Sequence, residues 1–190
     1  MDRLVYALAA SAAFGVQAVS APAFAAQPNA TVQGDLPPDL KAEIVRAIGD
    51  TDRPIENRFE ARRRARAGAE DAVAVLRSEG YYGYDVQSDI GPADAPAAMV
   101  KIAPGPRFLI ADAKIAWSGA APDAKAQAAA TLALHLRDGN PGRAAEVIGA
   151  EGRAVAAVQR VGYADAQADP REVIVDHADH TVRPTFKIRA

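Results

Sequence analysis

A nine-residue phrase occurs twice in this chain, as Val73–Tyr81 (VAVLRSEGY) and again as Val155–Tyr163 (VAAVQRVGY). Each copy has the apolar spacing of a helix end and runs through Gly-Tyr into a strand-like stretch. A second echo follows each copy, in Val100-Lys101-Ile102 and in Phe186-Lys187-Ile188. A helix and strand unit repeated at roughly 80 residues predicts consecutive small domains of one kind, an arrangement typical of binding scaffolds.

The N-terminus has the pattern of a secretory signal. Arg3 precedes an alanine-rich apolar run to Val19, and Ala23 and Ala25 have the spacing that signal peptidase prefers. We expect residues 1–25 to be a signal peptide, which would export the protein to the periplasm of a Gram-negative bacterium. A membrane anchor is the alternative, but a spanning helix needs about 20 strongly apolar residues, and this run is shorter.

Composition limits what the remaining residues can be. They suffice for two small cores, and because the chain contains no cysteine, packing alone must hold those cores together. The formal net charge of −2 gives the chain as a whole no attraction to nucleic acid, so we expect no such partner. The sequence has no G-x-S-x-G, phosphate-loop or H-E-x-x-H motif, and we therefore expect neither an enzyme nor a cofactor.

The first unit is expected to span residues 36–106. Residues 26–35 are polar and proline-rich and are interpreted as a leader, with Thr31-Val32-Gln33 the one candidate for an opening strand. Apolar spacing then predicts a helix that ends at Gly49 and a second that ends before Gly80. The hairpin that closes the unit is expected at 84–90 and 98–103.

The second unit is expected to span residues 107–190. Apolar residues at alternate positions from Leu109 to Trp117 predict one half-buried strand. Two helices should follow, the first burying Leu132 and the second starting at Asn140-Pro141, an N-cap with proline at the first helical position. In the final hairpin, Pro184 suits an edge strand better than a central one.

The predicted order in each unit is strand, helix, helix, strand, strand. Two helices on one face of a small three-stranded mixed sheet form an α+β fold, the compact solution for a unit of this length. This order resembles the polypeptide-transport-associated (POTRA) domain. The phrases Leu76–Tyr82, Val100–Ile102 and Gly105–Phe108, after the arginine-rich Phe59–Ala65, resemble the TamA family within the BamA/TamA superfamily. The structural signature consists of Gly80, Tyr81, Gly105, Pro106, Gly162 and Tyr163.

The resemblance implies a periplasmic array of POTRA domains followed by a transmembrane β-barrel that helps insert autotransporters and other outer-membrane proteins. It also implies two kinds of partner, a TamB-like inner-membrane protein and unfolded outer-membrane clients. The 190 residues contain no barrel pattern, so we interpret the chain as the N-terminal part of a larger protein at the periplasmic face of the outer membrane. A free-standing periplasmic POTRA-like adaptor without a barrel is the alternative.

The candidate binding surfaces are the edges of the two sheets. An exposed edge can accept an extended client strand because its backbone groups form hydrogen bonds without demanding a particular sequence. The strands that follow the two Gly-Tyr turns are the predicted edges, and Tyr82 has no tyrosine counterpart in the second copy. The candidate partner-binding residues are Tyr82, Tyr84, Val86, Ala164 and Ala166.

Each of two clusters of charged or polar residues can be interpreted either as a binding site or as ordinary protein surface. Arg62-Arg63-Arg64 with Arg66 could bind phosphate or lipid headgroups, but such a run is more often a solvated helix face. His177 and His180 stand beside acidic residues and superficially resemble a metal site. Because no further ligands converge on them in the sequence, we expect no metal.

Overall fold

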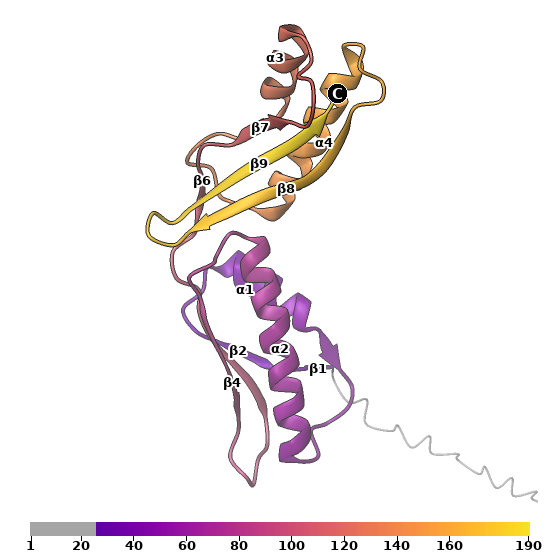
Figure 1. The fold of residues 1–190 in the computed structure, drawn as a ribbon. Helices are drawn as coiled ribbons and strands as arrows, with labels where there is room; N and C mark the ends of the chain where they lie inside the picture. Colours follow the sequence, from indigo (N-terminus) through magenta and orange to yellow (C-terminus); the bar gives the residue numbers. More distant parts are fainter. Residues whose placement is uncertain (1–25) are drawn as a thin grey trace, which may run out of the picture.

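The computed structural model describes residues 26–190, so the expected signal peptide, residues 1–25, lies outside the described residues. Two units follow one another along a common long axis (Figure 1), and each packs two helices against a small sheet. The first contains β1 (Gln27–Pro28), β2 (Thr31–Gln33), α1 (Pro38–Ile48), β3 (Asp50–Thr51), α2 (Arg58–Ser78), β4 (Asp85–Ile90) and β5 (Ala98–Ala103). The second contains β6 (Leu109–Ile110), β7 (Lys114–Trp117), α3 (Ala124–Ala133), α4 (Ala144–Arg160), β8 (Gln167–Asp176) and β9 (Thr181–Arg189). The predicted α+β class is confirmed.

The first sheet has the order β2-β5-β4, with β2 parallel and β4 antiparallel to the central β5. Helices α1 and α2 place their apolar stripes on this sheet, where Ile44 and Leu76 are fully buried against Val100. Each such side chain contributes about 1.5–3 kcal/mol by leaving water. Packing of this kind holds β5 in place and leaves β4 on the outside.

The segment expected to be a leader, residues 26–35, is part of the first unit. β1 pairs with β3, and β2 pairs with β5 in a register that sets Val32 beside Val100. The opening strand was hard to see in the sequence because three residues are too short to display alternation. Gly34 ends it with a φ of +135°, and a Cβ there would lie 2.0 Å from the carbonyl oxygen of Ile102, so only glycine fits.

The second sheet is built around β9. β8 pairs with it on one side, while β6 and β7 pair with successive parts of its other side, both in parallel. The single strand predicted over Leu109–Trp117 is therefore wrong. The chain turns at Asp112, whose φ is +51°. The predicted alternation of buried and exposed side chains does not run through this turn: Ile110 is buried, while Leu109 is 39% exposed.

Pro184 lies in the central strand, contrary to the prediction, and it is buried. On one side of β9, pairing with β6 ends at Val182 and pairing with β7 starts at Thr185. Pro184 falls in the gap between these two short strands. A residue without a backbone N–H costs least where no neighbour needs that donor, and this gap explains why β9 tolerates a proline.

The helices of the second unit also differ in detail from the prediction. Leu132 is 77% exposed because α3 packs through the small side chains of Ala126 and Ala130 instead. α4 begins at Ala144 rather than at Asn140, since Pro141 forms a bridge with Leu109. Within residues 26–190, no helix combines the length and the apolar character that crossing a membrane requires.

Candidate functional site

β4 is the outer strand of the first sheet, and in the part of the chain that the structure describes no strand pairs with its other side. Figure 1 shows it along the outer margin of the lower unit. Its six residues pair with β5 in an unbroken register, from Asp85 opposite Ala103 to Ile90 opposite Ala98. The strand contains no proline and no bulge. Such an edge presents a row of backbone donors and acceptors that another strand can use.

The predicted residues of this edge lie at its beginning. Tyr84 immediately precedes β4, and its hydroxyl accepts a hydrogen bond of 2.8 Å from Nε of Arg77 in α2. The Arg77 guanidinium also lies 5.7 Å from the centre of the Tyr84 ring. Val86 is within β4 and packs its side chain on the first core. The two side chains therefore fix β4 to the unit, while the backbone of β4 remains available at the edge.

The edge predicted in the second unit begins later than expected. β8 starts at Gln167, so Ala164 and Ala166 lie outside the strand, and that prediction is wrong in its residues. A turn delays the strand, because the backbone N–H of Ala166 donates to the carbonyl oxygen of Tyr163 and the Gln159 side chain donates to the carbonyl oxygen of Ala166. Ala166 is consequently buried, only 3% exposed.

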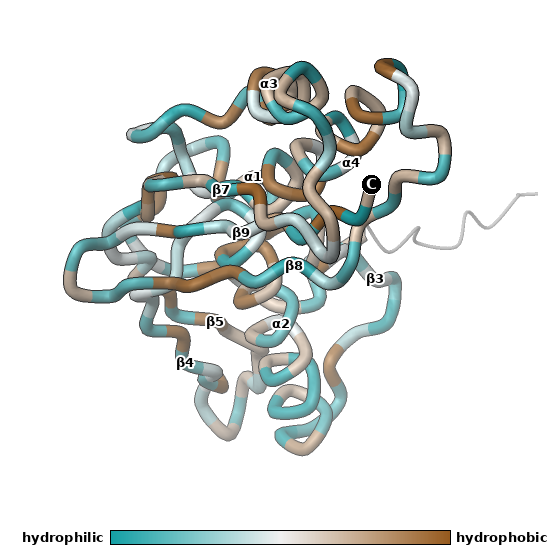
Figure 2. Tube along the Cα trace, turned by 45° about the horizontal axis from the view of Figure 1, so that its top comes forward, coloured by the Kyte–Doolittle hydropathy of each residue, from teal (hydrophilic) through white to brown (hydrophobic). Residues whose placement is uncertain are grey.

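β8 is nevertheless an outer strand, and it is less open than β4. Pro170 removes one backbone donor, and the register with β9 shifts between Asp169 and Glu172. Proline and bulges are devices that protect edges from pairing. Beyond the shift, β8 is regular and carries the hydrophobic stretch seen in brown on β8 in Figure 2, with Ile174 52% exposed.

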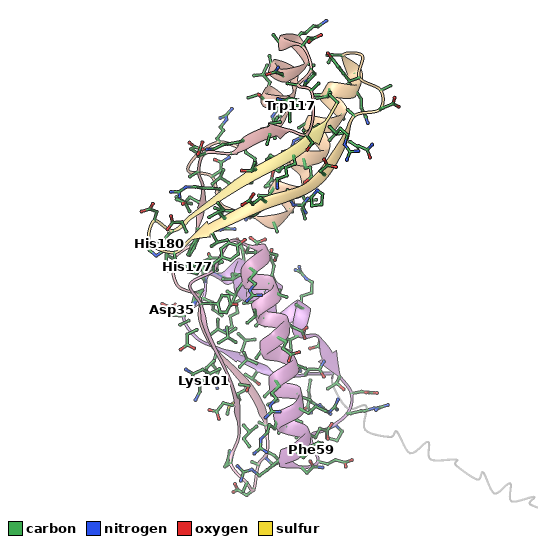
Figure 3. The ribbon with its side chains drawn as sticks, viewed as in Figure 1. Asp35, Phe59, Lys101, Trp117, His177 and His180 are labelled. Atoms are coloured by element: carbon green, nitrogen blue, oxygen red, sulfur yellow. The ribbon has the colours of Figure 1, made fainter. Side chains whose placement is uncertain are left out.

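The joint between the units is built on Phe108, which is fully buried. Tyr82 comes from the first unit, yet it packs with the second core, edge-on to Phe108 with ring centres 5.4 Å apart. His177 and His180 each lie edge-on to the same ring at 5.2 Å (Figure 3). Among residues 26–190 no three His, Asp or Glu side chains gather as a metal site. The two histidines thus take part in aromatic packing at the joint.

Glu79 adds ionic contacts to this joint. Its carboxylate accepts hydrogen bonds from Arg107 at 2.7 Å and from Arg143 at 2.9 Å, and Arg107 also donates to the Glu79 carbonyl oxygen. The adjacent Gly80 has a φ of +88°, and a Cβ there would lie 3.1 Å from the carbonyl oxygen of Gly142. The repeat phrase of the first unit therefore ends in direct contact with the second unit.

The other signature residues have structural contacts. Gly105, with a φ of +67°, approaches Gly83 so closely that a Cβ would lie 2.5 Å from the Gly83 carbonyl oxygen. Tyr81 is buried beneath the Arg107 guanidinium, and Tyr163 accepts a hydrogen bond of 2.9 Å from the backbone N–H of Asp123. Tyr81 thus belongs to the first core and Tyr163 packs against the second. Pro106 and Gly162 are exposed.

The arginine run divides into one buried and three exposed residues. Arg64 is 8% exposed, pairs with Glu60 and donates a hydrogen bond of 2.9 Å to the carbonyl oxygen of Arg53, so its expected place on a solvated face is wrong. The bond to Arg64 is the main reason that the pKa of Glu60 is lowered. Arg64 follows Ala61 by three residues and precedes Gly68 by four, and both neighbours are buried. The three residues therefore share the inner face of α2, and this spacing is visible in the sequence. Arg62, Arg63 and Arg66 are exposed.

The solved structures that are similar to this chain include three of POTRA domains. POTRA domains 1-2 of the periplasmic domain of Omp85 from Anabaena match with 14% identity and a TM-score of 0.51, over 84% of this chain and 93% of that one. A structure of POTRA domains 1-3 of the same protein matches with 14% identity and a TM-score of 0.52, over 84% of this chain and 59% of that one. POTRA domains 3-5 of Haemophilus influenzae BamA match with 16% identity and a TM-score of 0.42, over 65% of this chain and 48% of that one.

The likeness to the two Anabaena structures shows that the chain has the POTRA fold. It covers most of the described residues and therefore includes both units. No family model matches the sequence, and no curated protein matches it.

Proposed function

We propose that this chain is the periplasmic POTRA region of an outer-membrane protein assembly factor and that it binds unfolded client polypeptides by strand addition. The open, unbroken edge of β4 carries the proposal. An extended client needs only backbone hydrogen bonds to pair there, so clients of different sequence are accepted. The likeness to POTRA domains from the periplasmic region of Omp85 supports this function.

β4 is the stronger of the two edges. Its outer side is interrupted by neither proline nor bulge, whereas β8 has both within its first half. Two carboxylates, Asp85 and Asp89, lie on β4, and Lys101 on β5 pairs with Asp89 at 2.6 Å. These charges discourage permanent association between copies, as charged residues on natural edges do, while leaving the backbone groups free for a transient client.

Disulfide crosslinking tests the edge directly, because the chain has no cysteine of its own. Gln87→Cys places a single thiol on an exposed residue of β4, and Ala128→Cys, on an exposed residue of α3, is the matched control. We expect a client peptide with one cysteine to form a disulfide with the first variant and not with the second. Equal crosslinking of the two variants, or none at β4, would remove strand addition at this edge.

Proline substitution separates binding from folding. Successive N–H groups of a strand point in opposite directions within the sheet, so of Val86→Pro and Gln87→Pro one removes an outward donor and the other removes a bond to β5. We expect the outward variant to keep its unfolding midpoint and to lose client binding. If both variants bound clients normally, the proposal would fail.

The finer assignment is to a TamA-like factor that handles autotransporters and contacts a TamB-like inner-membrane protein. The phrases around Gly80 and Gly105 support it through their resemblance to that family. An antibody against residues 40–190, applied to separated cell fractions, tests whether the native protein resides in the outer membrane. A band there that is much larger than 19.8 kDa and shifts on heating is expected, whereas a periplasmic band near that size would favour a free-standing adaptor.

A further inference from the structure

The N-terminal half of α2 carries a basic strip with an exposed aromatic ring, which the proposed function does not use. Phe59, Arg62, Arg63 and Arg66 are spaced three, four and seven residues apart and therefore share one face of the helix. Together with Ala67 and Glu70 they line a shallow depression on the surface. We define these four residues, Phe59 to Arg66, as the basic strip.

The ring of Phe59 is 75% exposed, and the three arginines of the strip are also exposed. Within the described part of the chain none of these arginines forms an ion pair or a side-chain hydrogen bond. The Glu60 carboxylate on the same turns bonds to Arg64 instead, on the inner side of α2. Glu70 lies at one end of the depression and pairs with no cation among residues 26–190. The strip consequently presents three arginines without an ion-pair partner around an apolar ring, with the Glu70 carboxylate at its end.

The strip also lies at an extremity of the molecule. Figure 3 shows Phe59 at the end of α2 that is remote from the second unit, and Figure 1 marks the C-terminus at the opposite end of the protein. The exposure of these side chains leaves the strip open to an approaching surface within the described part of the chain.

We propose that the basic strip binds an anionic lipid surface, with the three guanidinium groups on lipid phosphates and the Phe59 ring among the headgroups. All three cations are arginines, whose planar groups donate paired hydrogen bonds to phosphate oxygens more readily than lysine does. An exposed aromatic ring among such cations matches the composition of helices that lie in a membrane interface. Electrostatic attraction then acts together with burial of the ring.

An acidic segment of a partner protein offers the same charge, but the geometry favours the membrane. The depression is shallow and stands on a single helix, whereas a peptide is usually held between two elements that bury its side chains. The Phe59 ring is 75% exposed, and the only hollow beside it among the described residues is this depression on α2. A membrane supplies the apolar layer that this ring lacks.

Co-sedimentation of residues 26–190 with lipid vesicles tests the proposal, and this segment contains every residue of both cores. The probes are vesicles rich in phosphatidylglycerol and vesicles of phosphatidylcholine alone. We expect binding only to the first, and we expect salt to weaken it because exposed charges are screened. Failure of the unsubstituted protein to bind phosphatidylglycerol would overturn the proposal.

Two sets of variants locate the binding. Replacing Arg62, Arg63 and Arg66 by Gln should lower the partition coefficient on the order of 100-fold, since each arginine near an anionic surface contributes about fivefold. Phe59→Ala should lower it about tenfold through the lost burial of the ring. The control with the same change of charge replaces three exposed cations elsewhere by Gln: Arg46, Lys125 and Arg137.

The controls decide the outcome in either direction. All of the substituted side chains are exposed, so the thermal unfolding midpoints should stay together and a folding defect would be recognised. If the control set lost as much binding as the strip variants, binding would depend on the net charge of the protein, and the strip would have no specific role. If soluble poly-glutamate bound more tightly than the vesicles, a protein partner would replace the lipid. Gln87→Pro and Val86→Pro should bind vesicles normally, which separates this inference from the proposed client edge.

Discussion

The two copies of the repeat phrase end in different surroundings although their sequences are similar. In the first copy, Gly80 and its neighbours meet the second unit, whereas a Cβ at Gly162 in the second copy would find nothing within 4 Å. Among the differences between the copies, Glu79 corresponds to Val161, and Tyr82, directly after the phrase, corresponds to Ala164. Glu79 and Tyr82 are the residues that touch Arg107, Arg143 and Phe108.

This comparison separates two tasks of the same phrase. The tyrosine that both copies share, Tyr81 or Tyr163, packs on the core of its own unit, whereas the shared Gly80 also approaches Gly142 of the second unit. The residues that only the first copy has, Glu79 and Tyr82, connect that unit to the next. Two of the positions at which the copies differ, Glu79 and Tyr82, thus belong to the joint between the units.

The largest difference is expected between the two repeated glycines. Gly80→Ala and Gly162→Ala both force alanine into a positive φ, +88° and +119°, which costs about 1–2 kcal/mol. Only Gly80→Ala also brings a Cβ to 3.1 Å from the Gly142 carbonyl oxygen, so we expect a total loss of about 2–4 kcal/mol there. Urea unfolding midpoints measure both. Equal losses would show that the joint does not depend on close approach at Gly80.

The next largest effect concerns Arg64, whose counterpart in the second copy is Glu146. Arg64→Met keeps an apolar stem but removes the bonds to Glu60 and to the carbonyl oxygen of Arg53, and we expect a loss of about 2 kcal/mol. The neighbouring Arg62→Met should change the free energy of unfolding by less than about 0.5 kcal/mol because Arg62 is exposed. Thermal unfolding of both variants checks the difference. Similar midpoints would mean that Arg64 behaves as a surface residue.

Much of the fold could be predicted from local spacing, because helices of this kind bury a regular stripe. α1 ends before Gly49, and α2 ends before Gly80, as expected. β4 and β5 also occupy nearly their predicted positions. The α+β class follows from that order of elements. The outer position of β4 was expected for the same reason.

The errors arose where a distant partner decides the structure. β2 is a strand only because β5 lies beside it, and Pro184 is tolerated in β9 only because β6 and β7 leave a gap there. Leu132 points outward because α3 packs closely through alanines. A prediction that assigns the largest apolar side chains to the core places Leu132 inside instead. The packing of Tyr82 against Phe108 of the next unit was not predicted, and its role in binding a partner stays a prediction. None of these contacts is visible in a short window of sequence.

A smaller effect is expected from Glu79→Gln, which gives the first copy a neutral residue where the second copy has Val161. The ionic contacts are partly exposed, so the free energy of unfolding should fall by no more than about 1 kcal/mol. The orientation of the units should respond more clearly. Spin labels on Gln87→Cys and Leu132→Cys would report a broader distance distribution between the units. Val161→Glu is the matched control, and a change there equal to that of Glu79→Gln would separate the joint from this carboxylate.

The smallest effect concerns the ionisation of Tyr82, which has no equivalent at Ala164. Burial raises the pKa of the Tyr82 phenol above its ordinary value, although the Arg77 charge opposes the shift. The protonated Tyr82 phenol contributes fully to the stability of the folded state below the ordinary pKa of tyrosine. This contribution is lost as the pH rises through the raised pKa of the folded protein, because the unfolded chain releases the proton first. Tyr82→Phe retains the ring against Phe108 and removes the ionisable group. We therefore expect the wild-type protein to lose stability relative to Tyr82→Phe between about pH 9 and pH 12 in chemical unfolding experiments. Parallel curves for the two proteins would mean that the phenol is solvated at the joint and that only its ring serves the contact between the units.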